Sequence, residues 1–167
     1  MQIRDEEDRD RAAVREIVSA EFDTGGEADL VDQLRAAADT LVSLVAEEDG
    51  AIVGHVMFSP VTIDGHPDAR LMGLAPLAVL YDYQSRGIGS ALVRAGLERC
   101  RDLGVLGVVA VGHPDYYPRF GFVPASSFGL KCEYDVPDNA FLALELVPGA
   151  LANKAGTVRY HAAFGRL

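Results

Sequence analysis

Gly87 and Gly89, near the middle of the chain, have the spacing of glycines that let backbone N–H groups approach a bound anion. The segment 84–90 consists of Gln84, Ser85, Arg86, Gly87, Ile88, Gly89 and Ser90. It lies between an apolar run and a stretch with helical spacing, so its backbone N–H groups and the helix dipole would attract negative charge. Arg86 adds a positive charge there. The segment predicts an anion-binding loop. The alternative is a tight strand-to-helix turn that uses glycine for its geometry alone.

Two common phosphate-binding loops are excluded by the residues that follow the glycines. A nucleoside-triphosphate loop requires a lysine directly after its last glycine, and Ser90 stands there. A dinucleotide-binding fingerprint requires a further small residue at the position of Leu92, and an acidic residue near positions 108–110, which are Val, Val and Ala. The loop therefore belongs to neither class.

A strand before the loop and a helix after it must position these residues. Residues 70–80 predict a strand that follows a turn at Asp64 and Gly65. Residues 87–103 predict a helix that stops at Gly104. Its inward-facing residues are expected to be Ile88, Ala91, Leu92, Ala95, Cys100 and Leu103. The apolar run 105–111 predicts a buried strand, and the strand–helix–strand crossover predicts a parallel pair.

The rest of the chain predicts two helices followed by more strands. Residues 2–4 suggest a short strand, and the acidic residues 5–10 suggest the first turn of a helix ending near Phe22. A second helix is expected from about Glu27. The runs 41–46 and 51–58 flank Gly50 and predict a hairpin within an antiparallel meander. A short helix over 114–120 and a strand over 141–147 complete a single mixed α/β domain spanning residues 1–167.

Composition and charge narrow the class of protein. The 167 residues include 15 basic and 25 acidic side chains, a formal net charge of −10, which disfavours binding to nucleic acid or a membrane surface. The apolar run 71–81 is too short for a membrane helix, and the opening residues lack a secretory signal pattern. Cys100 and Cys132 have neither disulfide nor zinc spacing. We expect a soluble cytoplasmic protein without a metal.

Two stretches together carry a family resemblance. The loop 84–89 resembles the acyl-CoA loop of the GNAT N-acetyltransferases, Gln/Arg-x-x-Gly-x-Gly/Ala, and the strand and helix around it are placed as in that family. Residues 113–122 resemble the family's Tyr-x-x-x-Gly-Phe segment after its fifth strand. Combined with residues 77–79, they are similar to a subgroup of predicted YhbS-like acetyltransferases. The resemblance covers roughly residues 1–147 in element order and implies the GNAT fold, a mostly antiparallel twisted sheet flanked by helices.

The resemblance implies acetyl-CoA as co-substrate and a V-shaped opening between two parallel strands. The fourth strand, near Leu77, Ala78 and Val79, would splay there from the fifth, near residues 109–112. Pantetheine would pair with main-chain groups of Ala78 and Val79, and the pyrophosphate would bind the amides of residues 86–90. A backbone N–H near Val79 would stabilise the oxyanion.

The resemblance implies one residue for proton transfer, Tyr117, and the place of His113 at the end of a strand makes it a candidate for a second. Tyr117 matches the position of a proton donor to the departing thiolate; the alternative is a tyrosine that packs against the cofactor. His113 ends the fifth strand and would deprotonate the ammonium directly or through water, or else would cap the short helix. Gly73 stands where some relatives carry a glutamate base. Pro118 departs from the commoner family pattern inside the short helix.

Other titratable residues have structural interpretations. We expect Tyr116 in the core and His55 as a packed or hydrogen-bonded histidine. His66 and His161 are expected on loops or the surface. Three acidic residues near the first helix pair, which in this family borders the acceptor site, are equally explained as a solvated charged face: Glu21, Asp23 and Glu27.

The function expected from these features is transfer of an acetyl group from acetyl-CoA to a primary amine of a small molecule or peptide by direct attack. A CoA-binding sensor or partner module on the same fold is the alternative, and an oxidoreductase is disfavoured by the fingerprint mismatch. Neither cysteine is placed as an acyl carrier. The segment 148–167 is expected to be an extension that either covers the active site or forms the contact of a homodimer.

Overall fold

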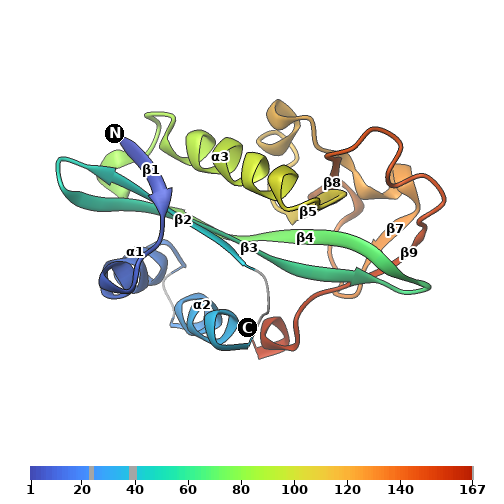
Figure 1. Cartoon of the computed structure of the whole chain (residues 1–167), viewed down its shortest axis with the longest axis horizontal. Helices are drawn as coiled ribbons and strands as arrows, with labels where there is room; N and C mark the ends of the chain where they lie inside the picture. Colours follow the sequence, from blue (N-terminus) through green and yellow to red (C-terminus); the bar gives the residue numbers. More distant parts are fainter. Residues whose placement is uncertain (23–24, 38–40, 167) are drawn as a thin grey trace. The chain divides into compact units, whose positions relative to one another are not determined.

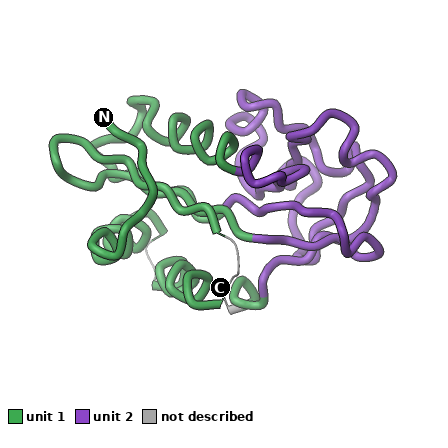
Figure 2. Tube along the Cα trace, viewed as in Figure 1, with its two compact units in different colours: residues 1–59, 75–99, 162–167 green, residues 60–74, 100–161 purple. Residues whose placement is uncertain are grey.

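The computed structural model describes residues 1–22, 25–37 and 41–166. The chain forms two compact units (Figure 2). The first consists of Met1–Ser59, Ala75–Arg99 and Ala162–Leu167, and the second of Pro60–Leu74 and Cys100–His161. Two long strands, β3 (Ala51–Ile63) and β4 (His66–Val79), contribute residues to both units.

The first unit begins with strand β1 (Gln2–Asp5), a 3-10 turn (Asp8–Asp10) and helices α1 (Arg11–Phe22) and α2 (Gly26–Ala37). The prediction that the acidic residues 5–10 form the first turn of a helix holds only for Asp8–Asp10, whose 3-10 turn leads directly into α1, whereas Asp5 belongs to β1. Asp10 is buried and accepts hydrogen bonds from both terminal nitrogens of Arg4, at 2.7 and 3.0 Å. A paired arginine stabilises a buried carboxylate more than a helix dipole does, and it lowers the pKa of Asp10.

The predicted hairpin is confirmed as β2 (Val42–Glu48) and β3, which pair antiparallel around Asp49 and Gly50. These two residues have φ angles of 50° and 83°, as a tight two-residue turn requires. The second turn, at Asp64 and Gly65, leads into β4, which begins at His66, earlier than predicted. In the first unit the strand order is β1-β2-β3-β4.

Helices cover both faces of the sheet in this unit, α1 and α2 on one face and α3 (Ile88–Asp102) on the other (Figure 1). The inward face of α3 is confirmed at Ile88, Leu92 and Cys100, but Leu103 is 39% exposed. The helix ends before Leu103, and Gly104, at φ 77°, turns the chain away. Phe22, at the end of α1, is likewise exposed. Near the C-terminus, a 3-10 helix (Ala162–Arg166) packs against α2.

The second unit contains the parallel pair that the crossover predicts. Strand β5 (Gly107–Val111) runs parallel to β4, with Leu71 opposite Gly107 and Leu74 opposite Ala110. It begins two residues later than predicted, because the N–H of Val105 donates to the carbonyl of Cys100 instead of joining the ladder. Strand β8 (Phe141–Glu145) pairs antiparallel with β5 on its other side. The mixed α/β class with a parallel β4–β5 pair is therefore confirmed.

Three short strands complete the second unit. Strand β6 (Val123–Pro124) pairs with β8, and β7 (Leu130–Cys132) runs parallel to β9 (Gly156–Arg159). Strand β9 pairs antiparallel with β3, with Ile63 opposite Val158. The unit is held by an apolar cluster drawn from all the larger strands, including Val61, Leu71, Val109, Phe141 and Val158. Part of the segment 148–167 is thus an integral strand of this unit.

No helix among the described residues is long and apolar enough to cross a membrane. In the same part of the chain, His, Cys, Asp and Glu side chains nowhere form a group of three that could hold a metal ion.

Candidate functional site

The predicted anion-binding loop connects the end of β4 to the start of α3. Gly87 has a φ angle of 82°, so the turn itself requires glycine there. A β-carbon on Gly87 would have no heavy atom within 4 Å, so the space in front of this residue is open. Gly89 lies within α3 and has no positive φ. The turn-geometry interpretation therefore explains Gly87 but leaves Gly89 unexplained.

The N-terminus of α3 suits a negative ligand. Helical hydrogen bonding starts at the carbonyl of Gly87, which accepts from the N–H of Ala91 at 3.0 Å. The N–H groups of the first turn thus precede the first bond within the helix and face out of its end. No acidic side chain lies in this turn. Partial positive charge with no carboxylate in the first helical turn is the chemistry that binds a phosphate.

The side chains of Gln84 and Arg86 make contacts that stabilise the loop. Nε2 of Gln84 donates to the main-chain oxygen of Val79 at 3.0 Å and to Oε2 of Glu21 at 3.1 Å. The guanidinium of Arg86 stands over the ring of Tyr83, 5.1 Å from its centre, which fixes its charge beside the loop. Gln84 thus has a structural role that the sequence did not indicate. Glu21, which was also explained as part of a solvated charged face, accepts a hydrogen bond from Gln84.

Burial alternates between neighbouring side chains at the strand end that precedes the loop. Ala78 is buried, whereas Leu77 and Val79 are half-buried. The N–H of Leu80 donates to the carbonyl of Val53 on β3 at 2.9 Å, so the strand remains paired up to this point. The opening predicted between residues 77–79 and the end of β5 involves both units and stays a prediction.

Tyr117, in the second unit, is buried at 8% exposure in a 3-10 helix (Tyr117–Phe120). Its ring packs edge-on against Tyr116 and Phe122, with ring centres 5.2 and 5.4 Å away. A β-carbon on Gly112 would lie only 2.6 Å from Cε2 of Tyr117, so the close approach of this ring requires glycine. Burial raises the pKa of Tyr117 to about 12, and the phenol therefore keeps its proton over the physiological range.

The predicted short helix begins later than expected. Residues 114–116 form a turn, in which the N–H of Tyr116 donates to the carbonyl of His113. The N-cap of the helix is Tyr116 and no side chain caps it, so the alternative role of His113 as a cap is wrong. Pro118 fits without disturbance, because a proline in the first helical turn removes no needed hydrogen bond. His113 is exposed just after β5.

Gly73 and Tyr160 lie against each other within the second unit. A β-carbon on Gly73 would lie 3.0 Å from Val61 and 3.8 Å from the ring of Tyr160. Tyr160 follows β9, and burial together with nearby acidic groups raises its pKa. No sequence motif marked Tyr160; the only signal was its alternation with Val158 along the strand.

Residues 11–122 match the Acetyltransferase (GNAT) family. The chain belongs to the GNAT family. Over 167 residues it is 36% identical to the uncharacterized N-acetyltransferase YhbS of Escherichia coli, and the alignment covers 99% of each protein. Over 133 residues it is 41% identical to the uncharacterized N-acetyltransferase YjhQ of Escherichia coli, which covers 77% of this chain and 74% of the relative.

Two solved GNAT structures are similar over nearly the whole chain. The crystal structure of YhbS from Escherichia coli in complex with CoA has a TM-score of 0.93 at 36% identity, covering 99% of this chain and 92% of the other. A GNAT family acetyltransferase from Brucella melitensis in complex with acetyl-CoA has a TM-score of 0.81 at 40% identity, covering 98% and 97%. The resemblance to the GNAT family and to its YhbS-like subgroup is confirmed.

The remaining histidines of this GNAT chain have structural surroundings. His55 is fully buried, and its Nε2 lies 2.9 Å from Oγ of Ser43, as expected of a packed histidine. Burial and the charge of Arg35 lower its pKa to about 3. His66 is half-buried, with Nε2 3.1 Å from the carbonyl of Ala155, and His161 is half-buried after β9. Of the acidic residues near the helix pair, Glu27 is half-buried and Asp23 lies outside the described residues.

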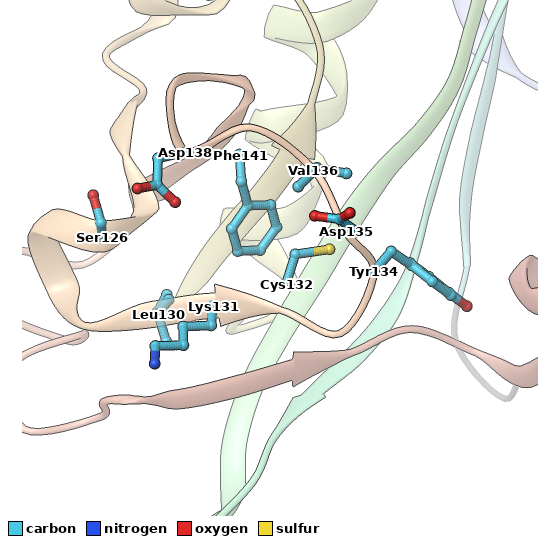
Figure 3. Close-up of a pocket in the computed structure, with 9 residues that line it drawn as sticks. All are labelled: Ser126, Leu130, Lys131, Cys132, Tyr134, Asp135, Val136, Asp138 and Phe141. Carbon is cyan, nitrogen blue, oxygen red and sulfur yellow. The ribbon is translucent and has the colours of Figure 1, made fainter.

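The cysteines of this GNAT chain are poor nucleophiles. Burial raises the pKa of Cys100 to about 12 and also raises the pKa of Cys132. Cys132 lines a cavity of about 330 Å³ in the second unit, which none of the predicted site residues lines (Figure 3). The other lining residues mix apolar and charged side chains: Ser126, Leu130, Lys131, Tyr134, Asp135, Val136, Asp138 and Phe141.

Proposed function

We propose that this GNAT protein is an acetyl-CoA-dependent N-acetyltransferase acting on a primary amine of a small molecule or peptide. The loop 84–90 carries the proposal, because it combines an acid-free helix N-terminus with open space before Gly87. The relatives solved with CoA and acetyl-CoA are 36% and 40% identical to this chain over nearly its full length.

In this proposal the pyrophosphate of acetyl-CoA binds the main-chain N–H groups of residues 86–90, and Arg86 adds a charge-assisted contact. Pantetheine pairs with main-chain groups of Leu77, Ala78 and Val79. The hydrogen bond from Gln84 to Val79 supports this arrangement, because it joins the two binding segments through one side chain.

Acetyl-CoA supplies an activated acyl group as its thioester, and the residues of the chain direct its transfer. The amine attacks the thioester carbon, the C–N bond forms and the C–S bond breaks. A backbone N–H near Val79 stabilises the oxyanion. His113 accepts the proton of the amine, directly or through water, and Tyr117 donates a proton to the departing sulfur. The raised pKa values of both cysteines support direct attack over an acyl-enzyme.

The pKa of Tyr117 limits how its proton can move. A thiol has an ordinary pKa near ~8.5, so complete transfer from a phenol of pKa about 12 would be uphill by ~5 kcal/mol. A hydrogen bond to the sulfur as charge develops does not need complete transfer. Tyr117 therefore works as a donor whose proton moves with the breaking C–S bond, provided that its own developing charge is stabilised.

A thiol-release assay with acetyl-CoA and a panel of amines, amino acids and peptides tests the proposal. Thiol release with at least one acceptor is expected, and the net charge of −10 favours cationic acceptors through electrostatic steering. Labelled acetyl-CoA alone should leave no acylated protein. Tight CoA binding with no turnover on any acceptor would favour the alternative, a CoA-binding sensor or partner module, which the lack of a carboxylate at Gly73 supports.

A further inference from the structure

The cavity of about 330 Å³ in the second unit has no role in the mechanism proposed above. Leu130 and Phe141, which line it, are buried members of the apolar cluster that holds this unit. Cys132 and Val136, which also line it, pack against the same cluster. At ~30 Å³ for each water-sized group, the cavity has room for about ten non-hydrogen atoms. It therefore has an apolar floor and the size of a small molecule.

Two carboxylates stand at the rim of this cavity. Asp135 and Asp138 are exposed, and within the described part of the chain neither side chain makes a hydrogen bond or an ion pair. In the view of Figure 3 their carboxylates lie on either side of the Phe141 ring. Their negative charge is therefore available to a cationic group of a ligand whose apolar part contacts the ring.

Lys131, the cationic residue of the lining, faces away from the cavity. It stands between Leu130 and Cys132 on β7, and successive side chains of a strand point to opposite faces. Leu130 is buried and Cys132 is half-buried, whereas Lys131 is exposed. In Figure 3 the ammonium of Lys131 points away from the Phe141 ring. The charge that a ligand meets at the cavity is therefore negative.

The cavity lies beside the end of β5, after which the proposed base follows. Phe141 begins β8 and pairs with Val111, the last residue of β5. The N–H of Gly112 donates to the carbonyl of Ala140 at 2.9 Å, so the two segments remain paired one step further. His113 comes next, ~7 Å along the chain from Val111. A molecule in the cavity can thus extend one end towards His113 within the same unit.

We propose that this cavity holds the acceptor of acetyl transfer, and that the acceptor is a small aliphatic diamine. One ammonium group binds Asp135 or Asp138 at the rim, and the methylene chain contacts the ring of Phe141. The other amine attacks the thioester carbon: the C–N bond forms, the C–S bond breaks, and the amine proton passes to His113. The role as acceptor rests on the proposed function, whereas the binding of the diamine in the cavity does not.

Charge and size together favour a diamine over a monoamine. The nitrogen that attacks must have lost its proton, so it is not the group that an aspartate holds as an ammonium ion. A second amine is needed to use the charge at the rim. Both groups must be joined by a chain short enough for about ten non-hydrogen atoms in all. The diamine 1,6-diaminohexane meets these conditions.

The test uses 1,6-diaminohexane as the probe and Cys132, which lines the cavity, as the reporter. Iodoacetamide alkylates the full-length protein without acetyl-CoA, and peptide mass spectrometry follows Cys132 by itself. Cys100 is fully buried, so its alkylation reports any opening of the fold. Burial raises the pKa of Cys132, and the reaction is therefore run near pH ~8.5, where an alkylammonium with a pKa of ~10.4 keeps its charge. The diamine should slow alkylation of Cys132 several-fold, whereas hexane-1,6-diol, of the same length but uncharged, should not.

The double variant Asp135→Asn/Asp138→Asn keeps the shape of both side chains and removes their charge. It should raise the diamine concentration needed for half-protection by about fivefold or more, the size expected of an ion pair at an exposed carboxylate. Asp68→Asn removes a charge from an exposed residue outside the cavity lining and is the matched control. Absence of protection by the diamine, or protection that is unchanged in the double variant, would overturn the inference.

Turnover separates this inference from the proposed function. If the chain acetylates 1,6-diaminohexane, the double variant should raise the KM for the diamine by the same factor and leave the KM for acetyl-CoA unchanged. If no acceptor supports turnover while the diamine protects Cys132, the proposed function fails and the binding site in the cavity stands. If other amines are acetylated and the diamine leaves Cys132 unprotected, the proposed function stands and this inference fails.

Discussion

Nε2 of Gln84 donates a hydrogen bond to the main-chain oxygen of Val79 at 3.0 Å, which ties the loop before α3 to the end of β4. Gln84 is exposed, but its hydrogen bond links two segments that are proposed to bind CoA. Gln84→Ala should therefore weaken CoA binding by ~0.5–1.5 kcal/mol, the net value of one such bond.

Arg86→Ala should weaken CoA binding more, by ~1–3 kcal/mol, because the contact of Arg86 with phosphate is charge-assisted. Calorimetric titration with CoA measures both. Arg94→Ala removes the same charge from an exposed position on α3 and should bind CoA normally.

Gly89 distinguishes a phosphate-binding loop from a simple turn. Its backbone is helical, so Gly89→Val introduces no left-handed strain, whereas any variant of Gly87 would. The added side chain should block the approach of the pyrophosphate and reduce CoA affinity by about 10²-fold or more, while the chain stays folded. Ala95→Val, a half-buried position further along α3, is the matched control. Normal CoA binding by folded Gly89→Val would contradict the loop assignment and the acetyltransferase proposal.

Tyr117→Phe separates binding from chemistry. The substitution removes one hydroxyl and little surface, so the affinity for CoA should stay near that of the unaltered protein. Turnover should fall by about 10²-fold, the lower end of what a general acid contributes. Tyr116→Phe removes a hydroxyl from the adjoining ring and should retain activity. Thiol release measured under saturating acetyl-CoA gives the comparison, and equal turnover in the two variants would exclude Tyr117 as the proton donor.

Gly112 allows the ring of Tyr117 to approach the end of β5. Gly112→Ala should destabilise the chain by ~1–3 kcal/mol, because its β-carbon would lie 2.6 Å from the Tyr117 ring and force it aside. Urea unfolding measures the change. In a Tyr117→Ala background the same substitution should cost much less, since the ring it displaces is gone. If Gly112→Ala lowers the free energy of unfolding equally in both backgrounds, contact with the Tyr117 ring is not the reason for glycine at this position.

His55 should make the stability of the chain depend on pH. Its folded-state pKa is about 3, below the ordinary value of 6.5, so the unfolded chain takes up a proton that the folded one refuses. The penalty is absent above pH 6.5 and grows as the pH falls towards 3. Between pH 7 and pH 5 the loss should be ~2 kcal/mol from this residue. Urea unfolding at pH 7 and pH 5 measures this loss of unfolding free energy. In His55→Gln the loss between the two pH values should be smaller than in the unaltered chain by that amount.

Sequence alone determined the features that depend on neighbours along the chain. The hairpin at Asp49 and Gly50, the helix stop at Gly104 and the glycine turn at Gly87 each require a positive φ angle, which glycine or a turn-forming residue supplies locally. The parallel β4–β5 pair followed from the order strand, helix, strand, because the handedness and length of the crossover leave few alternatives. The family motifs lie on these same local features, so the fold and the candidate loop could be predicted together.

Tertiary structure decided what depends on residues far apart in the sequence. Arg4 donates both to Asp10 and to Glu47, which is 43 residues away on β2, so the partners of the buried Asp10 carboxylate could not be inferred from helix rules alone. The raised pKa of Tyr117 comes from burial, and the place of Tyr160 beside Gly73 comes from the pairing of β9 with β3. Burial and close approach are set by many weak contacts between distant segments, and periodicity along one segment records only which of its faces is apolar.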